Sequence, residues 1–77
     1  MKNSIHFVGI GGIGMSALAR YFLSKGCQVT GSDTQETALI RELREEGMEI
    51  FLEHKAENIY DDVDLLVYSQ AVDTMNP

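Results

Sequence analysis

Four of six consecutive residues near the start of the chain are glycines, in the run Gly9-Ile10-Gly11-Gly12-Ile13-Gly14. Because glycine lacks a Cβ atom, such a run can turn sharply and can let another group approach its backbone closely. Residues 5–9, just before this run, have the composition of a short buried strand. Residues 14–25, which end the run and follow it, carry apolar side chains at the helical spacing i, i+3, i+4 and i+7. The feature therefore predicts a strand, a glycine loop and a helix in immediate succession.

The rest of the chain continues the alternation of strands and helices. Further strands are predicted by apolar segments at residues 27–31, 48–52 and 64–69. A second helix, capped by Thr34, is expected to end before Gly47, and about one helical turn is expected at 56–60. The continuous apolar run of the fourth strand predicts burial on both of its faces. Alternating strands and helices predict an α/β, Rossmann-like three-layer fragment with a parallel four-stranded sheet in the order 3-2-1-4.

Length and composition exclude several classes of protein. A chain of 77 residues forms at most one small domain, and its net charge of −6 with scattered basic residues argues against a nucleic-acid partner. No apolar run approaches the roughly 20 residues of a membrane span. The single Cys27 cannot form an internal disulfide, and no signal-peptide pattern is present, so we expect a cytoplasmic protein. No cluster of cysteines and histidines predicts a metal site.

The glycine run has the spacing of a phosphate-binding loop. Gly9, Gly11 and Gly14 match G-x-G-x-x-G, with Gly12 as an additional glycine, between a predicted strand and a predicted helix. The first amides of that helix, around Ile13 to Met15, are expected to lack intrahelical acceptors and to carry partial positive charge. A diphosphate would supply those acceptors, even in an acidic domain. The alternative is a glycine-rich turn that serves packing alone.

Polar residues after the later strands are candidates for the nucleoside side of such a ligand. Asp33 lies 19 residues after Gly14, where an acidic residue commonly holds ribose hydroxyls; alternatively, Asp33 or Thr34 caps the second helix. His54 follows the third strand, and Ser69 ends the fourth, so both fall at the carboxyl edge of the sheet. Each of these two could contact a ligand or satisfy local turn amides. On these features alone the ligand could be NAD or any nucleoside diphosphate.

Longer segments are more specific than the glycine spacing. The run HFVGIGGIGMSALA, at residues 6–19, closely resembles the start of the UDP-N-acetylmuramate–L-alanine ligases of the Mur ligase family. Similar segments of that family follow in the same order at GSD (31–33), FLEHKAENI (51–59) and VYSQAVDTMNP (67–77). One departure is Glu53, which stands where the family often has a glycine before the histidine. The resemblance covers essentially the whole chain.

The resemblance implies a function for residues 1–77 as a single N-terminal domain. In this family such a domain binds the UDP part of UDP-N-acetylmuramic acid, with the diphosphate at the glycine loop, and does not bind NAD. The resemblance further implies a cytoplasmic bacterial enzyme of peptidoglycan biosynthesis, whose absent central and C-terminal domains bind ATP, Mg²⁺ and L-alanine. No G-x-x-x-x-G-K-[ST] motif occurs here, so we expect no catalytic residue and no cofactor in this chain and no activity from it alone.

The expected UDP-binding set combines the glycine loop with residues after the other strands. It comprises Gly9, Gly11, Gly12, Ile13, Gly14, Met15, Ser32, Asp33, His54 and Ser69. The main alternative is a regulatory NAD-binding Rossmann module, which suits the glycine loop and Asp33 but not the later segments. A structural Rossmann half that binds nothing would leave the glycines poorly explained.

Overall fold

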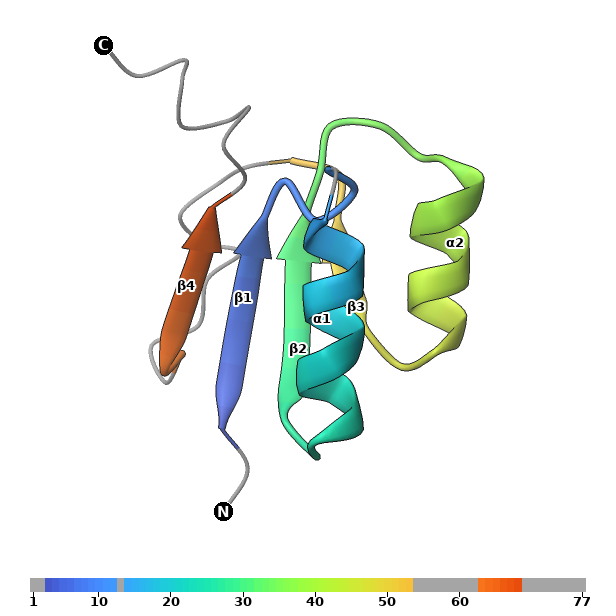
Figure 1. The fold of residues 1–77 in the computed structure, drawn as a ribbon. Coiled ribbons are helices and arrows are strands. Elements are labelled where there is room, and N and C mark those ends of the chain that lie inside the picture. Colours follow the sequence, from blue (N-terminus) through green and yellow to red (C-terminus); the bar gives the residue numbers. More distant parts are fainter. Residues whose placement is uncertain (1–2, 13, 54–62, 69–77) are drawn as a thin grey trace, which may run out of the picture.

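A parallel sheet with two helices forms the part of the chain that the computed structural model describes, residues 3–12, 14–53 and 63–68 (Figure 1). The elements are β1 (Ser4–Val8), α1 (Met15–Ser24), β2 (Gln28–Ser32), α2 (Ala38–Glu45), β3 (Glu49–Phe51) and β4 (Leu65–Tyr68). All three strand pairs are parallel, and the order is β3-β2-β1-β4. The predicted α/β class and strand order are confirmed. The short helix expected at 56–60 lies outside the described residues.

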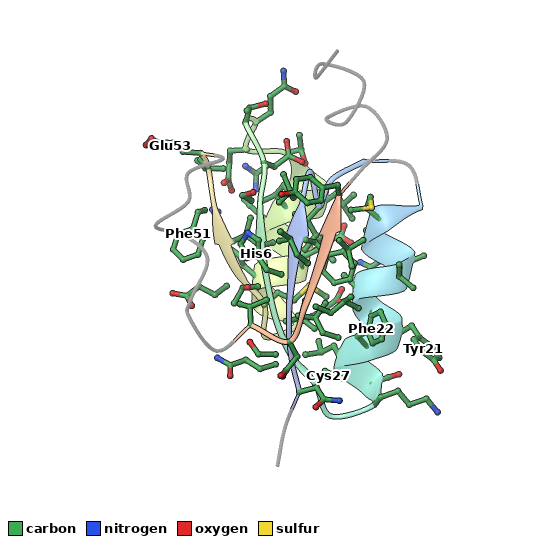
Figure 2. All side chains as sticks on the ribbon, turned by 90° about the vertical axis from the view of Figure 1, so that its left-hand side faces the viewer. His6, Tyr21, Phe22, Cys27, Phe51 and Glu53 are labelled. Carbon is green, nitrogen blue, oxygen red and sulfur yellow. The ribbon has the colours of Figure 1, made fainter. Side chains whose placement is uncertain are left out.

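The two faces of the sheet carry different side chains. Ile5 and Phe7 of β1 belong to the apolar core, together with residues of β2, β3 and both helices. His6 lies between them in sequence and therefore points to the opposite face, since side chains alternate along a strand. There its Nδ1 is 2.7 Å from Oγ1 of Thr30, and both residues are buried. Figure 2 shows Phe22 on the α1 side of the sheet and His6 and Phe51 on the other side.

The second helix begins later than the sequence indicated. Its N-cap is Thr37, whose Oγ1 accepts a hydrogen bond from the amide of Ile40 at 3.2 Å. The predicted cap at Thr34 is wrong, and so is the alternative cap at Asp33. The reason is that the carboxylate of Asp33 already accepts the amides of Thr34 and Gln35, which holds this segment in a loop.

The fourth strand is less buried than its apolar run suggested. Leu65 is 45% exposed and Tyr68 is 52% exposed, so the expectation of burial on both faces is wrong. The strand lies at the edge of the sheet beside β1, while α1 packs over β1 and β2. Edge position therefore overrides composition here. Neither described helix has the length and apolar character that crossing a membrane would require.

Candidate functional site

The glycine loop is fastened to the end of β2 by three consecutive backbone amides. The N–H groups of Gly9 and Ile10 both donate to the carbonyl oxygen of Ser32, at 2.8 and 3.0 Å. The N–H of Gly11 donates to Oδ2 of Asp33 at 2.8 Å. In Figure 1 this loop and the loop from β2 to α2 lie together at the end of the sheet to which the strand arrows point. The carboxyl ends of β1 and β2 thus form one connected structure.

The side chain of Ile10 also holds the glycine loop against the sheet. Ile10 lies inside the glycine run, yet its side chain is completely buried in the core. It packs on Gly31 of β2, where an added Cβ would lie 2.6 Å from Cδ1 and 3.0 Å from Cβ of Ile10. Only a glycine at position 31 leaves room for this side chain. The contact holds the loop against the sheet independently of its hydrogen bonds.

The carboxylate of Asp33 joins three segments. Besides accepting the Gly11 amide through Oδ2, it accepts the amides of Thr34 and Gln35 through Oδ1, at 2.8 and 3.4 Å. Its own amide donates to the carbonyl oxygen of Phe51 at the end of β3. A Cβ at Gly11 would lie 2.8 Å from Oδ2 of Asp33. The missing side chain of Gly11 therefore leaves space for this carboxylate.

The start of α1 forms the outer part of the loop. Gly14 is its N-cap residue and has φ +80°, a left-handed conformation that favours glycine, and a Cβ there would meet nothing within 4 Å. The Gly12 amide donates to Gly9 at 2.9 Å and the Met15 amide to Gly12 at 3.1 Å. The Met15 amide thus has no acceptor within α1, as expected, but a turn of the loop supplies one, so this amide is not left for a ligand. We call Gly12 and Gly14 the crest of the loop.

Within the described residues, the positive charge next to the loop is that of backbone amides. The structure describes four Lys and Arg residues, of which Arg20, Arg41 and Arg44 pair with glutamates of α2 or of the residues on either side of it. The Lys25 ammonium lies 5.5 Å from the centre of the Tyr21 ring, at the far end of α1. An anion at the crest would therefore be attracted chiefly by the N-terminal dipole of α1. No three His, Cys, Asp or Glu side chains gather as a metal site within the described ranges.

Comparison with known proteins places the chain in a family. The family model described as "Mur ligase family, catalytic domain" matches residues 4–77. The chain belongs to the Mur ligase family. A UDP-N-acetylmuramate–L-alanine ligase from Carboxydothermus hydrogenoformans is 53% identical over 74 residues, which are 96% of this chain and 16% of that protein. The ligase of the same name from Campylobacter jejuni is 46% identical over 77 residues, all of this chain and 18% of that protein.

A solved Mur ligase shares the fold as well as the sequence. The crystal structure of UDP-N-acetylmuramate-alanine ligase MurC from Thermotoga maritima matches with a TM-score of 0.83 at 50% identity, covering 96% of this chain and 17% of that one. This Mur ligase chain therefore spans about a sixth of the length of the relatives it matches.

The fold of this Mur ligase chain brings most of the expected binding residues together. Gly9, Gly11, Gly12, Gly14, Met15, Ser32 and Asp33 all lie at the carboxyl ends of β1 and β2. The side chains of Met15 and Ser32 are buried, at 7% and 1% exposure. Ile13, His54 and Ser69 lie outside the described residues. The sequence reasoning missed Ile10 and Gly31, although an isoleucine between loop glycines and a glycine inside a strand both signal a close contact.

Proposed function

We propose that this chain is the UDP-N-acetylmuramate-binding domain of an ATP-dependent ligase that adds L-alanine to UDP-N-acetylmuramic acid in peptidoglycan biosynthesis. The observation that carries the proposal is the glycine loop, which three amides fasten to β2 while its crest faces outward at the start of α1. Relatives about 50% identical bear the name of that ligase. The proposed enzyme is bacterial and cytoplasmic.

The proposed ligand orientation follows from the free surface of the loop. The diphosphate would lie over the crest and the first turn of α1, where helix amides and the helix dipole favour an anion. The uridine would approach the loop after β2, around Ser32 and Asp33. His54 and Ser69 are proposed neighbours from the sequence alone. The remaining members of the proposed set, Gly9, Gly11, Gly12, Ile13, Gly14 and Met15, form the loop itself.

The chain would contribute anchorage to the reaction. The sequence has no P-loop motif, and the described residues offer no cluster of metal ligands, so we assign ATP and Mg²⁺ to other parts of the longer enzyme. Holding the UDP end of the substrate restricts where its distant carboxylate can lie, and such positioning lowers the entropic part of a reaction barrier. We expect the 77-residue chain alone to release no phosphate from ATP and to ligate no alanine.

The NAD-binding alternative is weaker on the same geometry. In that interpretation Asp33 should present its carboxylate to ribose hydroxyls. Instead both carboxylate oxygens accept backbone amides, from Gly11 on one side and Thr34 on the other, at 2.8 Å each. The relatives reported above are also named as ligases.

Parallel titrations test the proposal. We expect UDP, and more strongly UDP-N-acetylmuramate, to shift amide resonances of Gly12, Gly14 and Asp33 in the ¹⁵N-labelled chain, with a Kd on the order of millimolar because only one domain contributes contacts. NADH should cause no comparable shifts. The same shifts at lower NADH concentration would replace the ligase proposal with the dinucleotide module. Shifts with neither ligand would remove the binding proposal for this chain.

A further inference from the structure

We infer that Asp33 is a positioning residue that holds the glycine loop in the shape a diphosphate fits, and that it is not a ribose ligand. The inference deepens the proposed function and rests on it. It reassigns the acidic residue that the glycine-loop pattern places after β2.

The carboxylate of Asp33 occupies the space that a side chain at position 11 would need. A Cβ at Gly11 would lie 2.8 Å from Oδ2 and 3.5 Å from Cγ of Asp33, and 3.4 Å from Cδ1 of Ile40. Gly11 does not have a positive φ, so its backbone conformation does not require a glycine. What requires the glycine is the carboxylate beside it. The second glycine of the motif therefore serves an internal contact of this protein.

The hydrogen bonds of Asp33 tie the loop to the carboxyl ends of β2 and β3. Oδ2 accepts the Gly11 amide, Oδ1 accepts the Thr34 amide, and the Asp33 amide donates to Phe51 at 2.9 Å. The loop thereby has fixed contacts to the ends of both β2 and β3. Because Gly11 is next to the crest, freeing its amide would let the crest adopt other conformations. A ligand would then have to restore the bound conformation at a cost in entropy.

The charge of Asp33 makes the inference unusually easy to test. A carboxylate near an anion-binding loop repels the anion, so its removal should strengthen diphosphate binding if charge were the only effect. Loss of a positioning contact would change diphosphate affinity in the opposite direction and weaken binding. Loss of a ribose contact weakens binding only for ligands that contain ribose. The three roles therefore predict three different results for one substitution.

Asp64 provides a matched control within the same chain. Its Oδ2 accepts the amide of Ser4 at 2.8 Å, which is the same kind of contact at the same length as that between Asp33 and Gly11. Ser4 begins β1, whereas the glycine loop follows the end of β1. Asp64→Asn therefore makes the same chemical change at the opposite end of the sheet. It should reduce stability without altering the loop.

The experiment compares UDP and inorganic pyrophosphate on the wild-type chain, Asp33→Asn and Asp64→Asn. Asparagine has one acceptor oxygen, and an NH2 group that only donates replaces the other, so it cannot accept Gly11 and Thr34 on the two oxygens that Asp33 uses. We expect Asp33→Asn to weaken binding of both ligands about tenfold, the effect of losing one hydrogen bond to a charged group. The Gly11 amide should exchange with solvent faster in Asp33→Asn. Asp64→Asn should leave both affinities and the Gly11 amide unchanged.

A second variant breaks the same contact while keeping the charge. Gly11→Ala places a methyl group against Oδ2 of Asp33 and should weaken both ligands similarly, with strand resonances confirming that the sheet is folded. Adding Asp33→Asn to Gly11→Ala should cause little further loss, because the contact is already broken.

The outcomes separate the two proposals. Unchanged or tighter pyrophosphate binding in Asp33→Asn would overturn the positioning role, and a loss confined to UDP would restore the ribose role. Unchanged exchange of the Gly11 amide would also overturn it. If the wild-type chain binds neither ligand, the proposed function itself fails, and the positioning role for a diphosphate fails with it.

Discussion

At each end of the sheet an aspartate carboxylate accepts a backbone amide, but the two contacts hold different kinds of segment. At the amino end, Oδ2 of Asp64 accepts the Ser4 amide and the Asp64 amide donates to the Ser4 carbonyl at 2.7 Å, so that β4 is joined to β1. At the carboxyl end, Asp33 accepts the amide of Gly11 and so fastens a loop. The first contact completes a ladder of strands. The second holds a loop whose crest remains available to a ligand.

Glycines at the two ends also differ in what they provide. Gly26, in the turn between α1 and β2, has φ +87° and no neighbour within 4 Å of an added Cβ. Gly11 and Gly31 at the carboxyl end lack positive φ but have close neighbours, Asp33 and Ile10. The turn at Gly26 thus uses glycine for backbone conformation, as Gly9 and Gly14 do at the carboxyl end, whereas Gly11 and Gly31 use it for space. Close packing marks the end where the candidate site lies.

The largest effect on stability is expected from Gly31→Ala. Its methyl group would lie 2.6 Å from Cδ1, 3.1 Å from Cγ2 and 3.0 Å from Cβ of the buried Ile10, so the side chain cannot avoid it by moving one terminal atom. We expect a loss of about 1–3 kcal/mol in the free energy of unfolding, measured by urea denaturation, and weaker UDP binding as Ile10 moves the loop.

Gly26→Ala is the control for that substitution. It strains the backbone without a steric clash, so it should cost about 1 kcal/mol and leave UDP binding unchanged. Equal losses of UDP affinity in the two variants would show that the close contact at Gly31 does not position the loop.

An intermediate effect is expected from Thr37→Ala, which removes the cap of α2. The Thr37 hydroxyl accepts the Ile40 amide at 3.2 Å, and loss of such a cap typically costs about 1 kcal/mol. Thr34→Ala, at the position that the sequence suggested as the cap, should change the free energy of unfolding by less than about 0.5 kcal/mol. Thermal unfolding of both variants measures the difference. A larger loss for Thr34→Ala would contradict the observed start of α2.

Sequence reasoning succeeded where the signal is repeated or local. The order of strands and helices follows from alternating patterns, and the place of the glycine loop follows from its spacing between β1 and α1. The ends of α1 also lie within one residue of the prediction, because Gly14 and Gly26 mark them. These features are encoded by residues that are near one another in the chain.

Sequence reasoning failed where a side chain has several possible partners that are far apart in sequence. Asp33 could cap a helix, hold a ribose or accept a loop amide, and only the folded arrangement places the Gly11 amide 2.8 Å away, across 22 residues of sequence. Similarly, the apolar run of β4 predicted burial on both faces, although the predicted strand order had already placed this strand at an edge of the sheet. Composition records which contacts are possible, and topology decides which are made.

The smallest effect is expected from Glu46→Gln, far from the glycine loop. Arg20 of α1 donates hydrogen bonds to Glu46 at 2.8–3.2 Å, and these bonds, followed by the charge of Arg20, hold the pKa of Glu46 below its ordinary value. A lowered pKa in the folded state means that the pair stabilises the protein at neutral pH and loses this contribution as pH falls through that pKa. Glu46→Gln should therefore lower Tm slightly at pH 7, and the difference from wild type should disappear in acid and shrink in high salt.

Glu45→Gln is the matched control, since the described residues offer Glu45 no ion-pair partner and its charge near the end of α2 opposes the helix dipole. It should leave Tm unchanged or raise it, and an equal decrease in both variants would assign the effect to net charge instead of the contact between α1 and α2.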